Sequence, residues 1–516
     1  MSGLDISNFG KSKIIDLHDF SKDLFPQRSK VAMCHGTFDL VHPGHLRQFI
    51  FAKSLGDILV VSLTCDKHIS KANFRPHVPE DLRALALAAI ELVDYIIIDK
   101  NPTPIEIIKA IKPDFFVKGY EYKEAKLGSK TDEERESVEK YGGKMIFSPG
   151  DIVFSSSKWI ENSPPDIRLE RLQNHFKKFD MEPTRVNKLL DRFKDCSVLI
   201  VGDLIIDTLV KGSVIGGMTK TPTISVRHEK STDYIGGAGI VAMHLAAAGA
   251  NVKLVTVVGE DSKGVEACNR IRDAGIELVA LEDETRPTIN KNAIIASDYR
   301  LLKLDYVDNR PVDDWILSEI SSVIRSFDGD MVIFSDFRHG IFNPGSIDAL
   351  IEAIPDDVFK VADTQVASRW GNILDFKNFD LITPNEREAR FALGDQETII
   401  RALGEDLMRE SLASNVILKC GSNGILGFSL SEEEEIDFFY LDSVAREVID
   451  PVGAGDGLLA YSSLALFAGG SLPTAGLLGS IAAALVCETD GNVPVEQSEV
   501  KARLADLFVY YPALEL

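Results

Sequence analysis

Short apolar segments alternate with helical stretches along most of the chain, and this alternation constrains the fold more than any other feature. In the first part, the segments 31–34, 58–63, 95–99, 115–119 and 144–148 have the pattern of strands, with helical patterns between them. Buried strands that alternate with helices are typical of parallel α/β sheets. The sequence therefore predicts an α/β fold.

The alternation stops in a polar, proline-bearing stretch, residues 162–195, and begins again at Ser197. A chain of 516 residues is also too long for one ordinary hydrophobic core. We therefore expect two domains joined by a linker. The expected division is an N-terminal domain over 1–162, a linker over 163–190 and a larger α/β domain over 191–516.

Two segments of the larger domain, within 209–235 and 288–306, are rich in β-branched residues and alternate between polar and apolar positions. This pattern predicts antiparallel strands that project from the main sheet as a small β lid.

Composition excludes some classes of function. The net charge is −23, which argues against a nucleic-acid-binding surface but leaves room for small anionic ligands. Neither a signal peptide nor an apolar run of about 18 residues is evident, so no membrane partner is expected. Six cysteines without a CxxC pair suggest neither a zinc site nor a redox motif. We expect a cytoplasmic protein.

The first strand leads into His35-Gly36-Thr37-Phe38-Asp39, then His42-Pro43-Gly44-His45 and a helix. Glycine permits close approach of the backbone, and the helix N-terminus offers free N–H groups to an anion. Two imidazoles at such a turn can stabilise charge that develops on a phosphate without any covalent nucleophile. The pattern predicts a phosphate site.

The HxGH spacing resembles the nucleotidyltransferase superfamily, and residues 30–162 are most similar to the nucleotidyltransferase half of the bifunctional heptose-phosphate kinase/adenylyltransferases. The resemblance implies a Rossmann-like domain. Glu121 stands where that family has Asp in KGxDY. The implied catalytic residues are His42, His45 and Lys71. The implied nucleotide- or phosphate-binding residues are Gly36, Thr37, Phe38, Arg75, Arg83, Ser156 and Ser157, and the implied substrate-binding residues are Asp39 and Lys118.

The strongest motif of the second part is Asp450-Pro451-Val452-Gly453-Ala454-Gly455-Asp456, followed by a helical stretch. Gly-Ala-Gly at a helix start presents backbone N–H groups to an anion, and Asp456 stands beside them. A carboxylate there can accept the proton of a substrate hydroxyl while the amides hold the transferred phosphoryl group.

Residues 190–510 resemble the ribokinase-type (PfkB) sugar kinases, whose signature contains GAGD. The resemblance implies a ribokinase-like fold, with Asp456 as the catalytic base. The implied nucleotide- or phosphate-binding residues are Lys419, Gly421, Gly424, Gly453, Ala454 and Gly455. The implied sugar-binding residues are Asp203, Asp207, Gly236 and Gly237, and Asn385 and Glu388 would organise magnesium through water.

The sequence departs from that family at three places. Ile240 occupies a position where many relatives have Asn near the sugar, Pro451 replaces a Thr, and Phe337 replaces a Tyr. The order of the two domains is also the reverse of that in the bifunctional heptose enzymes. These departures leave the identity of the sugar open.

Together, the resemblances imply a bifunctional enzyme of nucleotide-sugar synthesis. It would use ATP and Mg²⁺ to phosphorylate a sugar or sugar phosphate, such as a heptose 7-phosphate, and would transfer a nucleotidyl group from ATP or CTP to a sugar 1-phosphate. Two alternatives remain: a CTP-dependent cytidylyltransferase for a glycerol-like polyol phosphate fused to the matching kinase, or one domain that is a non-catalytic regulatory module. Small-molecule substrates and a homodimer or higher homo-oligomer are expected.

Overall fold

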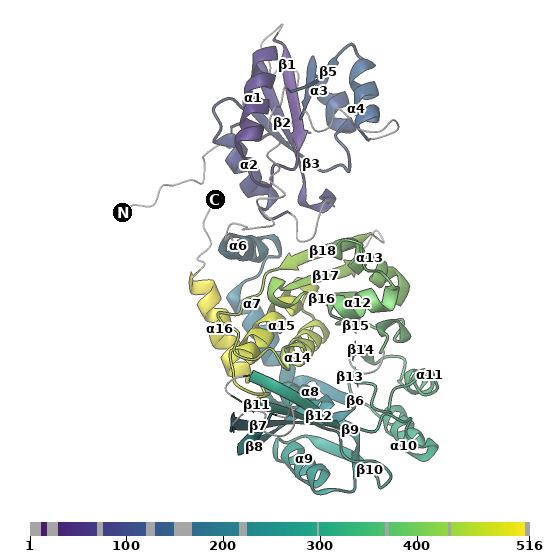
Figure 1. Ribbon diagram of the computed structural model, residues 1–516. Coiled ribbons are helices and arrows are strands. Elements are labelled where there is room, and N and C mark those ends of the chain that lie inside the picture. Colours follow the sequence, from purple (N-terminus) through teal and green to yellow (C-terminus); the bar gives the residue numbers. More distant parts are fainter. Residues whose placement is uncertain are drawn as a thin grey trace. The chain divides into compact units, whose positions relative to one another are not determined.

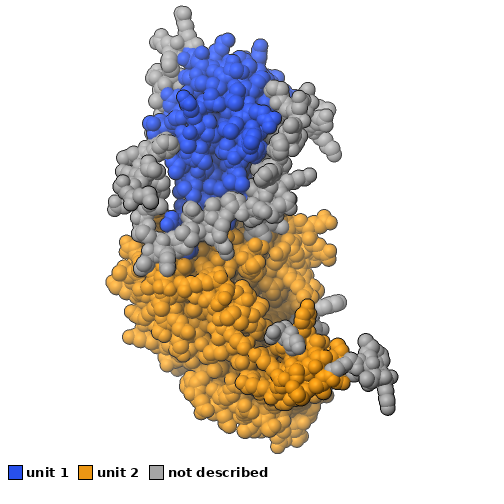
Figure 2. Space-filling view, turned by 60° about the vertical axis from the view of Figure 1, so that its left-hand side comes forward, with its two compact units in different colours: residues 1–174, 513–516 blue, residues 175–512 orange. Residues whose placement is uncertain are grey.

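The computed structural model describes residues 12–17, 29–69, 76–119, 130–148, 168–215, 224–296, 299–366, 371–431 and 435–510. The chain divides into two compact units, drawn blue and orange in Figure 2. Unit 1 comprises residues 1–174 and 513–516, and unit 2 comprises residues 175–512. The division falls within the predicted linker, whose own limits stay a prediction.

Unit 1 contains a parallel sheet whose five described strands have the order β3-β2-β1-β4-β5. The strands are β1 (Val31–Gly36), β2 (Ile58–Thr64), β3 (Tyr95–Asp99), β4 (Phe115–Lys118) and β5 (Lys144–Phe147). The helices are α1 (Pro43–Leu55), α2 (Glu80–Ala88), α3 (Ile105–Ile111) and α4 (Lys130–Glu139) (Figure 1). Strand order reverses between β1 and β4, the place where α/β sheets bind ligands.

Strand β1 shows why this sheet is buried on both faces. Ala32 and Cys34 belong to one apolar cluster, whereas Val31 and Met33 belong to another. Successive side chains of a strand point to opposite faces, so one short apolar strand contributes to two layers of the core. This explains why the strand has a continuous apolar sequence.

Unit 2 is built on a larger sheet with the described strand order β10-β9-β6-β13-β14-β15-β16-β17-β18. Pairing is parallel as far as β16 and antiparallel from there to β18. The strands are β6 (Ser197–Gly202), β9 (Asn251–Gly259), β10 (Glu277–Asp283), β13 (Met331–Asp336), β14 (Phe359–Thr364), β15 (Leu381–Ile382), β16 (Asn415–Lys419), β17 (Ile425–Leu430) and β18 (Ile436–Leu441).

Helices cover both faces of this sheet (Figure 1). Helices α14 and α15 pack against each other on one face, and α12 and α13 lie on the other. The helices within unit 2 are α7 (Pro183–Asp191), α8 (Ala238–Ala247), α9 (Ser262–Asp273), α10 (Asp314–Arg325), α11 (Ile347–Glu352), α12 (Glu386–Leu393), α13 (Ile400–Ser411), α14 (Ala454–Phe467), α15 (Leu472–Cys487) and α16 (Gln497–Tyr510). Helix α6 (Arg168–Lys178) includes residues on both sides of the division between the units. No helix in the described ranges is long and apolar enough to cross a membrane.

A separate small sheet forms the predicted lid, with the described order β12-β11-β7-β8. Its strands are β7 (Leu204–Val214), β8 (Val226–Gly237), β11 (Asn290–Ala296) and β12 (Tyr299–Tyr306). Strand β7 begins directly after β6, and β8 leads directly into α8, so the lid is continuous with the carboxyl edge of the main sheet. The predicted two-domain α/β architecture is confirmed.

Candidate active sites

The N-terminus of α14 presents the GAGD motif of unit 2. Gly453 has a φ of 82°, in the left-handed region, and a Cβ at this position would lie 2.1 Å from Oδ1 of Asn492. Both facts require glycine here. Ala454 and Gly455 then open the helix, and Asp456 lies in its first turn with 8% of its surface exposed.

Asp456 belongs to a buried group of charges at the carboxyl edge of the main sheet. Burial and the nearby carboxylate of Asp363 raise the pKa of Asp456 to about 8. Lys419, at the end of β16, forms an ion pair of 2.8 Å with Asp363, at the end of β14. A Cβ on Gly455 would lie 3.3 Å from Nζ of Lys419. The ammonium group therefore lies next to the helix N-terminus, whose free N–H groups can bind an anion.

Asn385 and Glu388 form a capping box at the start of α12. The Asn385 side chain accepts a hydrogen bond from the Glu388 backbone N–H at 2.9 Å, and the Glu388 carboxylate accepts from the Asn385 backbone N–H at 2.7 Å. Burial raises the pKa of Glu388 to about 7, because the opposing effect of Lys419 is smaller than the cost of burial. Asn385 and Glu388 thus cap the N-terminus of α12.

A pocket opens beside this capping box and contains two residues predicted to bind the nucleotide, Lys419 and Gly421. It is lined by Val366, Asn385, Glu386, Arg387, Arg390, Phe391, Gly394, Asp395, Gln396, Lys419, Cys420 and Gly421. Gly421 and Gly424 both have positive φ, and a Cβ on Gly424 would meet the Leu441 carbonyl oxygen at 2.0 Å. These glycines allow the tight turn between β16 and β17 that borders the pocket.

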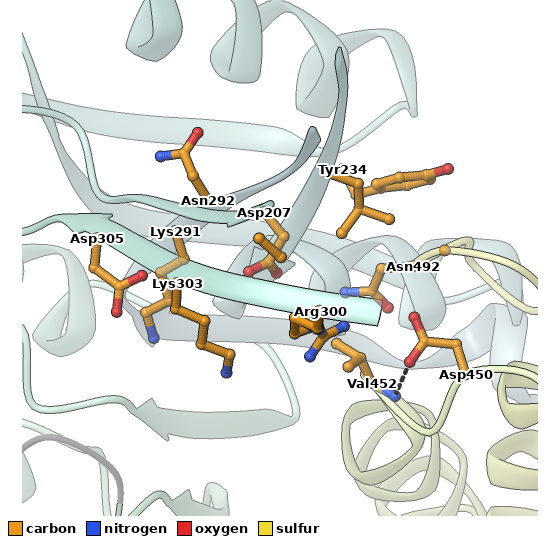
Figure 3. Close-up of a pocket in the computed structure, with 13 residues that line it drawn as sticks. Asp207, Tyr234, Lys291, Asn292, Arg300, Lys303, Asp305, Asp450, Val452 and Asn492 are labelled. Carbon is orange, nitrogen blue, oxygen red and sulfur yellow. Dashed lines mark hydrogen bonds between the residues drawn. The ribbon is translucent and has the colours of Figure 1, made fainter. Parts of the chain in front are cut away.

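The lid contributes a second pocket, which contains Asp207 (Figure 3). Lys291, Lys303 and Asp305 gather at one end, and Asp450, Val452 and Asn492 lie at the other. The full lining is Asp207, Leu209, Tyr234, Lys291, Asn292, Ala293, Arg300, Lys303, Asp305, Asp450, Val452, Gly491 and Asn492. Three cations from one hairpin therefore face a carboxylate predicted to hold a sugar.

Glycines at the root of the lid allow the close approach of both predicted sugar-binding aspartates. A Cβ on Gly236 would lie 2.3 Å from Oδ2 of Asp207, and one on Gly237 would lie 2.2 Å from the Asp203 carbonyl oxygen. Burial raises the pKa of Asp207, although Lys291 and Lys303 oppose this shift.

Asp203 supports the loop that follows β13. Its Oδ2 atom accepts hydrogen bonds from the backbone N–H groups of Phe337, at 3.2 Å, and His339, at 3.1 Å. Burial raises the pKa of Asp203 to about 6, although these hydrogen bonds oppose the shift. The Phe337 ring in turn lies 5.5 Å from Nζ of Lys291. Asp203 thereby organises a loop that contacts the lid.

In unit 1, the HxGH turn lies at the carboxyl edge of β1. Gly36 ends the strand, Phe38 has a φ of 47°, and His42 caps α1 by accepting a hydrogen bond from Gly44 N–H at 3.0 Å. The rings of His42 and His45 stack with their centroids 3.9 Å apart. Burial and the neighbouring His42 lower the pKa of His45 to about 3, so this imidazole is neutral near pH 7.

Asp39 and Arg83, two further residues of unit 1 predicted to bind ligands, form hydrogen bonds with backbone groups of the protein. The Asp39 carboxylate accepts hydrogen bonds from the backbone N–H groups of His77, at 3.0 Å, and Val78, at 2.8 Å. The buried guanidinium of Arg83 donates to the Thr37 carbonyl at 2.5 Å and also bonds the Thr64 and Val78 carbonyls and Asp66. In this geometry both side chains support the loop, and their predicted contacts with ligands stay predictions.

Lys118 ends β4, the strand next to β1, so it lies on the other side of the switch point from the HxGH turn. It pairs with the buried carboxylate of Glu134 on α4. Lys71, Arg75, Ser156 and Ser157 lie outside the described residues. The described part of the site thus brings together Gly36, Thr37, Phe38, His42 and His45, with Lys118 at the neighbouring strand end.

The pfkB family carbohydrate kinase model matches residues 197–497, more than half of the chain. The chain belongs to the pfkB family of carbohydrate kinases. A second model, cytidylyltransferase-like, matches residues 33–164, so the pfkB region follows the cytidylyltransferase-like region.

Relatives of this pfkB protein include two proteins named bifunctional protein HldE. The protein from Desulfatibacillum aliphaticivorans is 30% identical over 336 residues, which cover 62% of this chain and 65% of that protein. The protein from Caulobacter vibrioides is 32% identical over 316 residues, which cover 60% of this chain and 64% of that protein. The chain thus spans less than two thirds of the length of these curated relatives.

Solved structures agree with the pfkB assignment at the level of the fold. Phosphofructokinase-2 from Escherichia coli in complex with substrates and products has a TM-score of 0.51 at 16% identity, covering 60% of this chain and 99% of that chain. The tetrameric inhibited form of the same enzyme has a TM-score of 0.50 at 16% identity, with the same coverage.

Sequence reasoning missed several residues of the pfkB unit that line the lid pocket or the buried charge group. These residues are Lys291, Arg300, Lys303, Asp305, Asp363 and Asn492. The pairing of β11 with β12 sets Lys291 opposite Asp305 and Ala293 opposite Lys303. Lys303 and Asp305 are two residues apart in one strand and therefore share a face, which is the signal that could have found them together.

Proposed function

We propose that the chain is a bifunctional enzyme in which unit 2 phosphorylates a sugar phosphate with ATP and unit 1 transfers a nucleotidyl group to a sugar 1-phosphate. The observation that carries the kinase half is the position of Asp456, buried beside the Gly-rich start of α14 and electrostatically coupled to Asp207 and Lys291 of the lid pocket. A general base, an anion-binding helix start and a polar pocket are the parts that phosphoryl transfer to a hydroxyl needs.

In this proposal, Asp456 accepts the proton of the sugar hydroxyl. The N–H groups at the start of α14 and the ammonium of Lys419 stabilise the transferred phosphoryl group. Such positioning and charge stabilisation supply most of the catalysis in phosphoryl transfer. Asp207 holds sugar hydroxyls from the opposite side, while Asp203 fixes the loop that bears Phe337.

The residues around Lys419 suit a hydrated magnesium ion bound to the nucleotide. Asp363, Glu388 and Asp456 all act on the pKa of Lys419, so three carboxylates surround one ammonium group. Mg²⁺ usually keeps several waters and is bound by few carboxylates plus substrate phosphates. When bound, the ion supplies neutralisation of the charge on the transferring phosphates. Among the described residues, no group of three or more His, Cys, Asp or Glu side chains could hold a metal ion alone.

The lid pocket favours a sugar that already carries a phosphate. Lys291 is half-buried, whereas Arg300 and Lys303 lie on the exposed strand β12. All three line the lid pocket, and a neutral sugar would offer them no anionic group to bind. Charge-assisted hydrogen bonds to phosphate are stronger than neutral ones. Because the sequence resembles the bifunctional heptose-phosphate kinase/adenylyltransferases, a heptose 7-phosphate is the substrate that we propose.

In unit 1, the neutral imidazole of His45, its stacked partner His42 and the N–H groups at the start of α1 are the groups proposed to hold the α-phosphate of the nucleotide. They stabilise the charge that builds up when the sugar 1-phosphate oxygen attacks that phosphorus. The bond to the β-phosphate breaks, and pyrophosphate leaves. Lys118, near the end of β4, is proposed to bind the sugar phosphate.

A second candidate remains for unit 1 because its family model is described as cytidylyltransferase-like. In that case the nucleotide is CTP and the acceptor is a polyol phosphate such as glycerol 3-phosphate. The kinase would then make that polyol phosphate.

The test is a screen of the purified protein that follows pyrophosphate release. ATP or CTP is offered with heptose 1-phosphate, hexose 1-phosphates or glycerol 3-phosphate, and a parallel assay follows ADP formation from ATP with heptose 7-phosphate. We expect pyrophosphate with ATP and heptose 1-phosphate, and ADP with heptose 7-phosphate.

Pyrophosphate release only with CTP and a polyol phosphate would favour the second candidate. Absence of both reactions with every acceptor would contradict the proposed bifunctional enzyme. The variant Asp456→Asn controls for contaminating kinases, because it should lose ADP formation and keep pyrophosphate release.

A further inference from the structure

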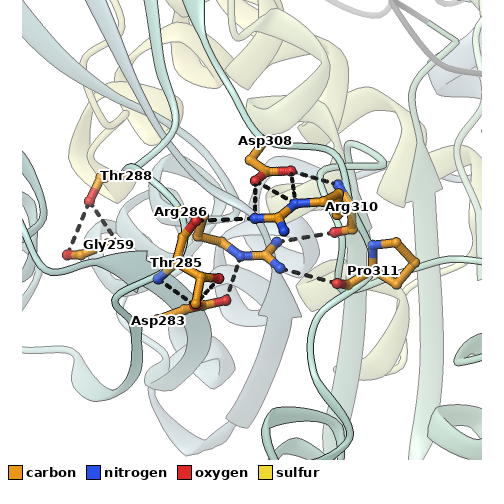
Figure 4. A network of polar contacts seen from close by, with 8 residues as sticks. All are labelled: Gly259, Asp283, Thr285, Arg286, Thr288, Asp308, Arg310 and Pro311. Carbon is orange, nitrogen blue, oxygen red and sulfur yellow. Dashed lines mark hydrogen bonds and ion pairs between the residues drawn. The ribbon is translucent and has the colours of Figure 1, made fainter.

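Two arginines connect the segment that enters the β11–β12 hairpin with the segment that leaves it (Figure 4). Arg286 lies between β10 and β11, whereas Arg310 follows β12. Each side chain donates to backbone carbonyl groups of the other segment. We call Arg286, Arg310 and their carboxylate partners Asp283 and Asp308 the hairpin clamp.

Arg286 is the buried half of the clamp. Its Nε donates to Oδ2 of Asp283 at 2.6 Å, and the two side chains are 7% and 4% exposed. Its terminal nitrogens donate to the carbonyl groups of Arg310 and Pro311, both at 3.1 Å. One planar guanidinium thus joins a carboxylate before β11 to two backbone carbonyls after β12.

Arg310 makes the reciprocal connection at the surface. Its guanidinium contacts Asp308 at 2.6 Å and donates to the Thr285 carbonyl at 3.1 Å. Hydrogen bonds from Arg310 lower the pKa of Asp308 to about 2, so the carboxylate stays ionised at any physiological pH. The two segments are therefore held by hydrogen bonds in both directions.

The clamp is also attached to the loop after β13. Val312 N–H donates to the Gly340 carbonyl at 3.1 Å. A Cβ on Gly340, whose φ is 124°, would lie 2.5 Å from the Arg310 carbonyl oxygen and 2.6 Å from a terminal nitrogen of Arg286. The neighbouring His339 N–H is bound by Asp203. A continuous set of contacts therefore runs from the carboxyl edge of the main sheet to the base of the hairpin.

The hairpin needs such an attachment because packing does little to hold its outer strand. Every residue of β12, from Tyr299 to Tyr306, is exposed. Within the described part of the lid, β12 pairs only with β11, which pairs in turn with β7. A strand without buried side chains is easily displaced, so contacts at the base of the hairpin decide its angle.

We propose that the hairpin clamp is a positioning device, in which Arg286 and Arg310 hold β11 and β12 at the angle that brings Lys291, Arg300 and Lys303 to the phosphate of the sugar substrate. This inference rests on the proposed kinase function. Neither arginine of the clamp lines the pocket, so both act through the hairpin. Misplacement of binding groups by about 1 Å can cost up to 10²-fold in rate.

The test compares Arg310→Gln and Arg286→Gln with wild type in the full-length protein. Arg310→Gln is the safer variant, because this side chain is 63% exposed and its loss leaves no buried charge. We expect faster amide hydrogen exchange across β11 and β12 in the ligand-free protein, by roughly 10-fold. We also expect a KM for heptose 7-phosphate raised by about 10-fold, with kcat changed less than about threefold. Arg310→Lys should restore part of the loss.

Arg409→Gln is the matched control, since Arg409 is an exposed arginine with ion pairs to Glu405 and Asp406 on α13, away from the lid. It should leave hydrogen exchange of the hairpin and KM unchanged. A KM within twofold of wild type in both Arg310→Gln and folded Arg286→Gln overturns the proposal, whatever the exchange shows. If the wild-type protein does not turn over ATP with any sugar phosphate, the proposed function has failed, and the clamp is then judged on hydrogen exchange alone.

Discussion

Asp456 is the residue on which the proposed phosphoryl transfer depends most directly. Burial and Asp363 raise its pKa to about 8, so the ligand-free enzyme holds this carboxyl largely protonated at neutral pH. A general base must be ionised before it can accept a proton. The buried position that brings Asp456 to the transferred phosphoryl group therefore also sets a pH dependence.

We predict that kcat/KM of the kinase reaction increases with pH and levels off above about pH 8, because the ionised fraction of Asp456 increases over that range. Kinase assays between pH 6 and 9 at fixed ionic strength would measure it. The pyrophosphate-releasing reaction of the same protein is the control for general effects of pH. A flat kinase profile across this range would show that Asp456 does not titrate as the base.

Gly453 offers a second test at the residue scale. Gly453→Ala combines a left-handed φ of 82° with a Cβ only 2.1 Å from Oδ1 of Asn492. We expect a loss of about 1–3 kcal/mol in the free energy of unfolding and a larger relative loss of kinase activity, because the start of α14 must shift. Denaturant unfolding and kinase assays would measure both. Gly275→Ala is the control, since this glycine of the same unit also has a positive φ but an added Cβ would meet no atom within 4 Å.

The β11–β12 hairpin matters as an element, because its pairing assembles charges that are apart in the sequence. Pairing sets Ala293 opposite Lys303, and a register shift between Ile294 and Ile295 brings Arg300 opposite Ile295. Without that bulge, Arg300 would point to the other face of the strand from Lys303, since the two are three residues apart. The bulge thus lets both cations line one pocket.

We predict that Lys303→Gln raises the KM for a phosphorylated sugar by about 10-fold or more, because a charge-assisted hydrogen bond is lost. Its effect on the corresponding sugar without a phosphate should be small. Steady-state kinase assays with both sugars would measure the difference. Lys230→Gln, an exposed lysine on β8 of the same lid, should change neither value. Equal effects of Lys303→Gln on the two sugars would argue against phosphate recognition by the hairpin.

At the scale of the whole molecule, the two units have separate sheets and separate candidate sites. We predict that Asp456→Asn abolishes phosphorylation and leaves nucleotidyl transfer intact, and that His45→Ala does the reverse. Loss of a well-placed general base, as proposed for Asp456, or of a group that stabilises developing charge, as proposed for His45, commonly costs about 10²-fold or more in rate. ADP and pyrophosphate formation would be followed in the same preparations, with circular dichroism as a check of folding. If either substitution abolished both reactions in a folded protein, the sites would not be independent.

Local patterns in the sequence were sufficient to predict the architecture. They were also sufficient to predict which residues lie together within each motif. Alternating apolar and helical segments predicted two α/β domains with a small β lid, and this prediction is confirmed. The HxGH and GAGD motifs each lie at a turn between a strand or loop and a helix, where neighbours in sequence are neighbours in space. The limits of the domains, the homo-oligomer and the roles of the site residues stay predictions.

Only the tertiary structure decided which distant residues share a pocket and which protein groups the predicted site residues contact. Asp363 meets Lys419 because β14 and β16 end at the same edge of the sheet. Arg83 lies buried among carbonyl groups, and Asp39 accepts from the backbone of residues 77–78. Strand order, register and the bulge in the hairpin set these contacts. They depend on packing between segments far apart in the chain, whereas periodicity and turn chemistry are local properties that the sequence displays directly.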